Sequence, residues 1–399
     1  MSNKPANKIQ DLQYFGEFGG VNPSISDSAT YTFLHAKTML DTFEGHAEGC
    51  YLYSRHSSPS NLYLSKALAA MEFTETANVA ASGMGAITSV FLQVCGAGDH
   101  IVAGRTIYGG TYAFLKNFAP KMNISTSFVD ITSLEKVEAA ITPNTKMIYC
   151  ESISNPLLEI ANITELAKIA KKHGIILVVD NTFSPMMISP QKLGADVTIH
   201  SLTKFINGTN DTVGGVVCGT QEFIDGLKNV NDGAMMLLGP VMDSLRAASI
   251  LKNLRTLHIR MKKHSENAMY LAENFEKDGL KVVYPGLKSH KSYELMQSLY
   301  NVEYGFGGMM TIDVGNLEKA NELMELMQHE NLGYLAVSLG FYKTLFSAPG
   351  TSTSSEIPVE EQLEMGLSDG IIRFSIGLDN EIERTYRAMK NCMKQVGVL

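Results

Sequence analysis

The chain has 399 residues, of which 45% are hydrophobic and 19% charged, and its net charge is −8 with no long basic run. These values are typical of a globular protein with more than one domain, and they argue against nucleic-acid binding. No run of about 18 apolar residues occurs, so we expect no membrane span. Five widely spaced cysteines without a C-x-x-C pair favour reduced thiols, no metal site and a cytoplasmic location.

The first 56 residues have weak hydrophobic periodicity and several glycines, as in FGEFGGVNPS (15–24). Such a segment lacks the regular apolar face that a core helix or strand needs. We therefore expect residues 1–56 to form an arm that packs on another subunit.

From about residue 77 the chain alternates short apolar runs with longer segments of helical spacing. The runs expected to form strands are NVAAS (78–82), HIVAG (100–104), KMIYCES (146–152), GIILVVD (174–180), DVTIHS (196–201) and GGVVCG (214–219). Strands that alternate with helices, such as the one predicted over 163–174, indicate an α/β fold. The sheet should be mainly parallel and covered on both faces.

Beyond about residue 240 the pattern changes. Residues 244–279 predict one long helix, and strand-like runs follow at 281–286, 307–315 and 371–379. This order predicts a smaller α+β domain that the long helix joins to the first domain. We place the large domain at 57–253 and the small domain at 254–399.

Polar residues follow the predicted strands, and ligands of open parallel sheets bind beyond these carboxyl ends. The residues at these ends are Ser82, Gly83, Met84, Tyr108, Asn155, Asp180, Ser201, Thr203 and Lys204. Small residues at a helix start favour an anion, and a buried aspartate needs a cationic partner. A desolvated lysine has a lowered pKa and becomes a good nucleophile. Together they suit pyridoxal 5'-phosphate (PLP), which requires an amine, an acid for its ring nitrogen and a phosphate anchor.

Each of these residues also has an ordinary explanation. An aspartate at a strand end often caps a helix or a turn, and a lysine beside a glycine turn is usually solvated. A nicotinamide-dependent oxidoreductase is the alternative from another class. Its G-x-G-x-x-G fingerprint would need a glycine where Thr88 stands, and this absence argues against it.

VVDNTF (178–183) followed by HSLTKF (200–205) closely resembles the signature of the Cys/Met metabolism, or trans-sulfuration, family of PLP-dependent enzymes. This family includes methionine γ-lyases, cystathionine γ-lyases and cystathionine γ-synthases. The resemblance runs from about Tyr51 to the C-terminus and includes YLYSR (51–55), ASGMGAI (81–87), IYGGT (107–111), AVSLG (336–340) and IIRFSIGLD (371–379).

The resemblance implies fold type I, with a mostly parallel seven-stranded sheet in the large domain. It also implies a homotetramer built as a dimer of dimers, whose sites are shared between subunits. Lys204 would bond covalently to PLP, Asp180 would hold the ring nitrogen, and Tyr108 would stack on the ring and transfer protons. The phosphate would lie by Ser82, Gly83, Met84, Ser201 and Thr203, and by Tyr53 and Arg55 of a neighbouring subunit. The substrate would contact Arg373, Ser338, Asn155 and Lys343.

For function, the resemblance implies a carbon–sulfur lyase that acts by γ-elimination on a sulfur amino acid, giving a 2-oxo acid, ammonia and a thiol. The alternative is a γ-replacement transferase that uses an activated homoserine. A non-catalytic relative is disfavoured, because Tyr108, Asp180, Lys204 and Arg373 are all present.

Gly110 stands where methionine γ-lyases carry a cysteine, and the cystathionine enzymes also have a glycine there. Two other features depart from the family pattern. Lys343 stands where the family commonly has a glutamate, and SAPGTSTSSE (347–356) replaces a segment that commonly has a threonine-histidine pair. A lysine near the substrate's distal end would repel the amino group of cystathionine and spare methionine. The alternative is that Lys343 points to solvent.

Overall fold

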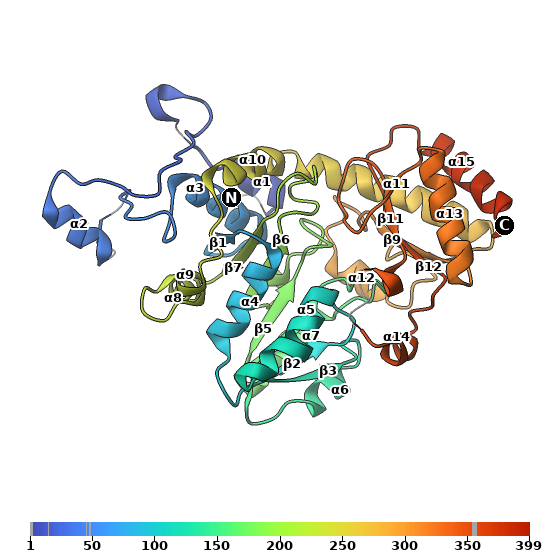
Figure 1. Cartoon of the computed structure of the whole chain (residues 1–399), viewed down its shortest axis with the longest axis horizontal. Helices are drawn as coiled ribbons and strands as arrows, with labels where there is room; N and C mark the ends of the chain where they lie inside the picture. Colours follow the sequence, from blue (N-terminus) through green and yellow to red (C-terminus); the bar gives the residue numbers. More distant parts are fainter. Residues whose placement is uncertain (1–2, 15, 45, 48, 353–356) are drawn as a thin grey trace.

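The computed structural model describes residues 3–14, 16–44, 46–47, 49–352 and 357–399. The N-terminal arm contains α1 (Pro5–Gln10), the short 3-10 helix η1 (Glu17–Gly19) and α2 (Ala36–Phe43). Its middle part reaches away from the rest of the chain (Figure 1). Phe18 and Leu34 are 99% and 96% exposed there, although large apolar side chains usually find a packing partner.

A seven-stranded sheet forms the centre of the large domain. Its strands are β1 (Thr76–Ala80), β2 (His100–Gly104), β3 (Ser125–Val129), β4 (Thr145–Glu151), β5 (Ile176–Asp180), β6 (Val197–Ser201) and β7 (Gly215–Gly219), in the order β1-β7-β6-β5-β4-β2-β3. Only β7 runs antiparallel to its neighbours, so the predicted mostly parallel sheet is confirmed. The prediction missed β3, an edge strand with no fully buried residue.

Helices cover both faces of this sheet, as the nearly continuous apolar strands require. On one face lie α3 (Pro59–Glu72), α6 (Leu134–Ala139), α7 (Ile163–His173) and α10 (Ser244–Leu254). On the other lie α4 (Gly83–Val94), α5 (Gly109–Ala113), α8 (Gln221–Lys228) and α9 (Ala234–Leu238). Short helical turns η2 (Phe114–Phe118), η3 (Ala119–Met122) and η4 (Pro190–Leu193) complete the domain. Alternate strand residues, such as Val178 and Val179, point to opposite faces.

The single long helix predicted over 244–279 is wrong, because the chain forms α10 and then α11 (Leu257–Lys277), with a break at Arg255 and Thr256. The carbonyl oxygen of Asn253 accepts hydrogen bonds from the Thr256 hydroxyl (3.0 Å) and from the Arg260 guanidinium (3.1 Å). The Thr256 N–H donates to the same carbonyl oxygen at 3.1 Å, so one backbone and two side-chain donors bind a carbonyl that a continuous helix would pair with the N–H of Leu257. Helix α11 leads from the large domain to the small one (Figure 1).

The small domain is built on a five-stranded sheet in the order β10-β11-β12-β9-β8, and this sheet with its helices confirms the predicted α+β architecture. Its elements are β8 (Lys281–Val283), α12 (Tyr293–Leu299), β9 (Met309–Asp313), α13 (Leu317–His329), β10 (Tyr334–Leu335), β11 (Leu345–Ser347), η5 (Pro349–Thr351), α14 (Val359–Met365), β12 (Ile371–Ser375) and α15 (Ile382–Gln395). Helices α11, α13 and α15 share one apolar core with this sheet. None of the helices in the described ranges is long and apolar enough to cross a membrane.

Candidate active site

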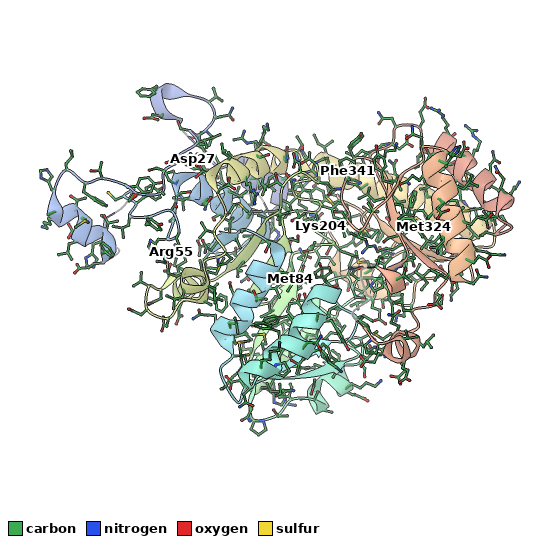
Figure 2. The ribbon with its side chains drawn as sticks, viewed as in Figure 1. Asp27, Arg55, Met84, Lys204, Met324 and Phe341 are labelled. Atoms are coloured by element: carbon green, nitrogen blue, oxygen red, sulfur yellow. The ribbon has the colours of Figure 1, made fainter. Side chains whose placement is uncertain are left out.

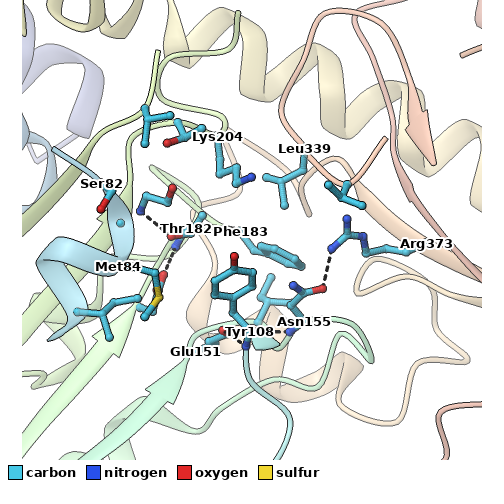
Figure 3. Close-up of a pocket in the computed structure, with 18 residues that line it drawn as sticks. Ser82, Met84, Tyr108, Glu151, Asn155, Thr182, Phe183, Lys204, Leu339 and Arg373 are labelled. Carbon is cyan, nitrogen blue, oxygen red and sulfur yellow. Dashed lines mark hydrogen bonds between the residues drawn. The ribbon is translucent and has the colours of Figure 1, made fainter. Parts of the chain in front are cut away.

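One cavity of about 240 Å³ lies where the carboxyl ends of the large-domain strands meet the small domain (Figure 3). The large domain contributes most of its lining, and the small domain contributes Val337, Leu339 and Arg373. The predicted residues that the structure brings together here are Ser82, Gly83, Met84, Tyr108, Asn155, Asp180, Ser201, Thr203, Lys204 and Arg373. The strand-end argument therefore located this cavity correctly.

Lys204 lies in the turn that follows β6 and points into the cavity (Figure 3). Its Nζ donates a hydrogen bond to the Ser338 hydroxyl at 3.2 Å. No carboxylate lies within 4.0 Å of this amine among the residues described. Burial, and secondarily the charge of Arg373, lowers the pKa of Lys204 to about 8. A substantial share of the amine is thus neutral near physiological pH and able to attack a carbonyl carbon.

Asp180 ends β5, and its carboxyl group is 7% exposed. Its Oδ1 accepts a hydrogen bond from the Thr182 backbone N–H at 2.9 Å, and the Tyr149 hydroxyl donates to Oδ2 at 3.5 Å. Burial raises the pKa of Asp180, although the Thr182 hydrogen bonds and the charge of His200 oppose the shift. A cation placed in the cavity would reverse this shift, and the protonated ring nitrogen of PLP is such a cation.

The N-terminus of α4 forms the wall of the cavity that lies across from Arg373 (Figure 3). Ser82 caps this 12-residue helix, because its hydroxyl accepts from the Gly85 N–H at 2.9 Å. The N–H groups of Gly83 and Met84 precede the first intrahelical hydrogen bond, so they are available to an anion. A side chain at Gly83 would place its Cβ 2.9 Å from Cβ of Ser201, so only glycine lets the helix start lie this close to the end of β6.

Ser201 and Thr203 extend the polar wall from α4 towards Lys204. The Ser201 N–H donates to the Thr182 hydroxyl at 2.9 Å, which ties the ends of β5 and β6 together. The Thr203 hydroxyl accepts from the Gly214 N–H at 3.1 Å. Hydroxyls and helix N–H groups on one side of the lysine, with a carboxyl in the same cavity, are the donor set that PLP requires. The described residues contain no cluster of three His, Cys, Asp or Glu side chains that could hold a metal ion.

Tyr108 precedes α5, and its ring stands in the cavity between Lys204 and Asn155 (Figure 3). Gly110 lies against this ring, since a Cβ added there would be 2.6 Å from Cε1 of Tyr108. A larger residue at position 110, such as a cysteine, would therefore require the ring to move.

Arg373, on β12, is 2% exposed and enters the cavity from the small domain. Its Nη1 donates to Asn155 Oδ1 at 2.8 Å, and its Nη2 donates to the Ser347 hydroxyl at 3.5 Å. Burial lowers the pKa of Arg373 to about 10, although the charge of Glu151 opposes the shift, and no carboxylate lies within 4.0 Å of the guanidinium in the described part of the chain. A buried guanidinium without an ion pair at this distance suits a carboxylate ligand, which it can bind with two hydrogen bonds.

Two other predicted substrate residues lie outside the cavity lining. The Ser338 hydroxyl contacts Lys204 and donates to Asn210 Oδ1 at 2.9 Å. Lys343 donates to Asn331, and its Nζ lies 4.6 Å from the ring centroid of Tyr334. Lys343 therefore has two partners of its own, away from the cavity lining.

Tyr53 and Arg55 do not reach the cavity of their own chain. Figure 2 shows Arg55 well apart from Lys204 and Met84. Its Nη1 donates to the carbonyl oxygen of Met236 at 3.2 Å, and its guanidinium lies 5.5 Å from the ring centroid of Tyr53. In a single chain these residues cannot serve the phosphate, so their predicted role depends on a second subunit.

Sequence reasoning did not single out several lining residues: Ile87, Glu151, Ile153, Phe183, Val213, Val337 and Leu339. Glu151 is the most informative omission, because it ends β4 as Asp180 ends β5. The argument that selected Asp180, an acid at the end of an apolar strand, applies equally to Glu151. The apolar residues gave no comparable signal, since their types are common in any core.

Residues 7–386 match the family model described as "Cys/Met metabolism PLP-dependent enzyme". The chain is 44% identical over 389 residues to a methionine gamma-lyase of Arabidopsis thaliana, with 96% of this chain and 88% of the relative covered. It is 38% identical to a cystathionine gamma-lyase of Bacillus subtilis, with 83% and 85% covered.

Among solved structures, the chain is similar to a putative O-acetylhomoserine (thiol)-lyase from Campylobacter jejuni. The TM-score is 0.90 at 28% sequence identity, and the match covers 98% of this chain and 100% of the other. That structure contains a pyridoxyl-lysine phosphate. The expected fold type I and the PLP cofactor are thereby confirmed.

Proposed function

The chain belongs to the Cys/Met metabolism family of PLP-dependent enzymes, and we propose that it cleaves methionine by γ-elimination. In this reaction the bond between Cγ and sulfur breaks. Methionine and water give 2-oxobutanoate, ammonia and methanethiol, with no net oxidation or reduction. The observation that carries the proposal is a single cavity that holds the Lys204 amine, the buried Asp180 carboxyl and the unpaired Arg373 guanidinium.

Five polar residues of the cavity, Lys204, Asp180, Arg373, Asn155 and Tyr108, have tasks in this reaction. PLP, when bound, supplies an electron sink that stabilises negative charge on the substrate α-carbon. Lys204 holds the cofactor covalently and then takes the proton from the α-carbon. Asp180 keeps the ring nitrogen protonated, and Arg373 with Asn155 orients the substrate carboxylate. Tyr108 transfers a proton to the departing sulfur.

The phosphate site is formed by Ser82, Gly83, Met84, Ser201 and Thr203, because helix N–H groups and hydroxyls converge there. Ser338 holds the Lys204 amine through its 3.2 Å hydrogen bond and thereby orients it for proton transfer.

The lining also supports an uncharged distal end on the substrate. Ile153, Phe183, Val213, Val337 and Leu339 are apolar. Four of the described lining side chains can carry a charge. Lys204, Asp180 and Arg373 have the tasks described above, and the Glu151 carboxyl group accepts hydrogen bonds from two backbone N–H groups. No charged group of the described lining therefore remains for the distal amino acid of cystathionine or the distal carboxylate of O-succinylhomoserine, whereas the thioether of methionine needs none.

The test is a comparison of kcat/KM for methionine, cystathionine and O-succinylhomoserine. Methionine should exceed each charged substrate by roughly 10-fold or more, the penalty for a charge without a partner. A higher value for either charged substrate would refute the assignment of methionine. Lys343→Glu is the matched variant: because Lys343 is held by Asn331 and Tyr334, the three ratios should change by less than about 2-fold.

The second candidate is γ-replacement on an activated homoserine, favoured by the similarity to the putative O-acetylhomoserine (thiol)-lyase structure. The two reactions differ in whether a thiol or water completes the turnover. With O-acetylhomoserine and added methanethiol, a replacement enzyme forms methionine, whereas an elimination enzyme continues to form 2-oxobutanoate. The product ratio distinguishes the candidates directly.

The proposed assembly is a homotetramer of two dimers, in which Tyr53 and Arg55 complete the phosphate site of the neighbouring subunit. The exposed apolar residues of the arm and the distance of Arg55 from its own cavity support this arrangement. We assign residues 1–56 to the arm, 57–253 to the large domain and 254–399 to the small domain, and the helix break at Arg255 supports the last boundary. The five cysteines are free thiols, which suits the expected cytoplasmic location.

A further inference from the structure

Glu151 lines the cavity, but none of the tasks above uses it. It is the last residue of β4, and its carboxyl group is 7% exposed. In the parallel pairing of β4 with β5 it lies directly opposite Asp180. Paired residues of adjacent strands point to the same face of a sheet, so both carboxyl groups emerge beside the cavity.

Both oxygens of Glu151 accept hydrogen bonds from backbone N–H groups in two different loops. Oε1 accepts from the Tyr108 N–H at 2.7 Å, and Oε2 accepts from the Asn155 N–H at 2.8 Å. Tyr108 lies in the segment between β2 and α5, and Asn155 lies in the segment after β4. The buried side chain of Glu151 thus joins two loops. Tyr108 lies 43 residues before Glu151 in the sequence, and Asn155 lies 4 residues after it.

These two loops carry the groups that must act on one substrate molecule. Tyr108 presents its ring to the cavity, and Asn155 Oδ1 accepts from Arg373 at 2.8 Å (Figure 3). A continuous series of hydrogen bonds therefore runs from the Tyr108 backbone through Glu151 and Asn155 to Arg373. Movement of either loop would change the distance between the proton-transferring phenol and the guanidinium that receives the carboxylate.

We propose that Glu151 is a positioning residue that holds Tyr108 and the Asn155–Arg373 pair at a fixed separation for the substrate. The proposal rests on the proposed function, in which Arg373 receives the substrate carboxylate. A carboxyl group is suited to this task because each of its oxygens can accept from one N–H. Glutamine has a single acceptor oxygen, so its NH2 group would face one of the two N–H donors. Aspartate is one methylene shorter and cannot span both loops.

The variant to test is Glu151→Gln. Burial, followed by the charge of Asp180, raises the pKa of Glu151. The substitution keeps the length of the side chain and replaces one acceptor oxygen with an NH2 group. Hydrogen exchange of the cofactor-free protein should become about 10- to 100-fold faster at the Tyr108 or Asn155 amide, since a buried hydrogen bond is lost. Peptides that cover residues 105–112 and 152–158 report these two amides.

The PLP-loaded enzyme supplies the second readout. L-norleucine has the shape of methionine without a sulfur atom to expel, and its binding should weaken about 10-fold or more in Glu151→Gln. For methionine, KM should rise because Arg373, which receives the carboxylate, is displaced, and kcat should fall because Tyr108 is displaced. Glu151→Asp should restore neither the wild-type KM nor the wild-type kcat, because it keeps a carboxyl group but is too short to contact both N–H groups. If Glu151→Gln does not fold, Glu151→Asp is measured in the same three ways.

The matched control is Glu159→Gln, another buried glutamate, which is 2% exposed. Its oxygens accept from side chains, the Thr106 hydroxyl and Lys291 Nζ, and not from the amides of Tyr108 or Asn155. Exchange at those two amides should remain unchanged in this variant.

Unchanged amide exchange and norleucine affinity in Glu151→Gln, or full recovery in Glu151→Asp, would overturn the positioning role. Faster exchange in the cofactor-free variant supports it even if the wild-type enzyme does not cleave methionine. A wild-type enzyme that does not cleave methionine would refute only the proposed substrate, so a failure of the proposed function can be told apart from a failure of the positioning role.

Discussion

Lys204 shows how a single residue acquires chemistry from its surroundings. At its ordinary pKa of about 10.5, only about one lysine amine in three thousand is neutral at pH 7. With the pKa lowered to about 8 by burial and by Arg373, the neutral share at pH 7 is about one tenth. The unfolded chain binds this proton more tightly than the folded chain. The contribution of Lys204 to stability therefore rises as the pH increases from about 8 to the unfolded value.

The first prediction concerns covalent PLP uptake by the cofactor-free enzyme. Because the neutral amine is the nucleophile, the rate should rise about 10-fold per pH unit below about 8 and level off above it. Stopped-flow absorbance measures this rate, with Nα-acetyl-lysine in the same buffers as the reference for PLP's own titrations. A rate that continues to rise towards pH 10, as for the free lysine analogue, would show that the protein does not lower this pKa.

At the scale of secondary structure, the turn that carries Lys204 is held by the first turn of α11. Arg260 is half-buried, and its guanidinium donates to the carbonyl oxygens of Phe205, Ile206 and Asn253, the last two at 2.8 and 3.1 Å. Burial lowers the pKa of Arg260 to about 10. The planar guanidinium can reach all three carbonyls at once, which a lysine ammonium on a single stem cannot.

The second prediction follows from this contact. Arg260→Gln should lower the free energy of unfolding of the cofactor-free protein by about 2–4 kcal/mol, since buried carbonyl groups lose their donors. Arg260→Lys keeps the charge and should recover less than half of the loss. Urea unfolding followed by circular dichroism measures both. A loss below about 0.5 kcal/mol for Arg260→Gln would show that water replaces the guanidinium without cost.

Local patterns predicted the central strands and the cavity they surround, because apolar runs and polar strand ends are properties of short sequences. They did not predict β3, whose STSFV segment (125–129) is half-buried at the sheet edge and has no continuous apolar run. They also missed the break between α10 and α11, because the apolar spacing continues across Arg255 and Thr256. Glu151 was missed although its position carried the same signal as Asp180.

At the scale of the whole molecule, one chain does not contain every predicted site residue. The arm presents exposed apolar side chains, and Arg55 binds Met236 far from the cavity (Figure 2). Sequence motifs identified Tyr53 and Arg55, but their geometry depends on a second subunit that a single chain does not include. Lys343 is a related case: the sequence located the residue, and its contacts with Asn331 and Tyr334 depend on the folded small domain.

The third prediction tests the shared site by mixing two inactive variants. Arg55→Ala should weaken PLP retention, and Lys204→Ala should abolish covalent attachment. If Arg55 serves the neighbouring subunit, a hybrid dimer contains one intact site. Equal mixing with subunit exchange should then restore roughly one quarter of the wild-type activity, because half of the dimers are hybrids with one active site in two. Activity no greater than the sum of the separate variants would show that the site lies within one chain.

The central claim is that Lys204 carries PLP as the catalytic group of this enzyme. Borohydride reduction of the PLP-loaded enzyme, followed by digestion and mass spectrometry, tests it most directly. We expect loss of the visible absorbance band and one pyridoxyl group on the peptide that contains Lys204. Lys204→Ala should give no labelled peptide under the same conditions. A pyridoxyl group on a different lysine of the wild-type enzyme, or no covalent label at all, would contradict the account.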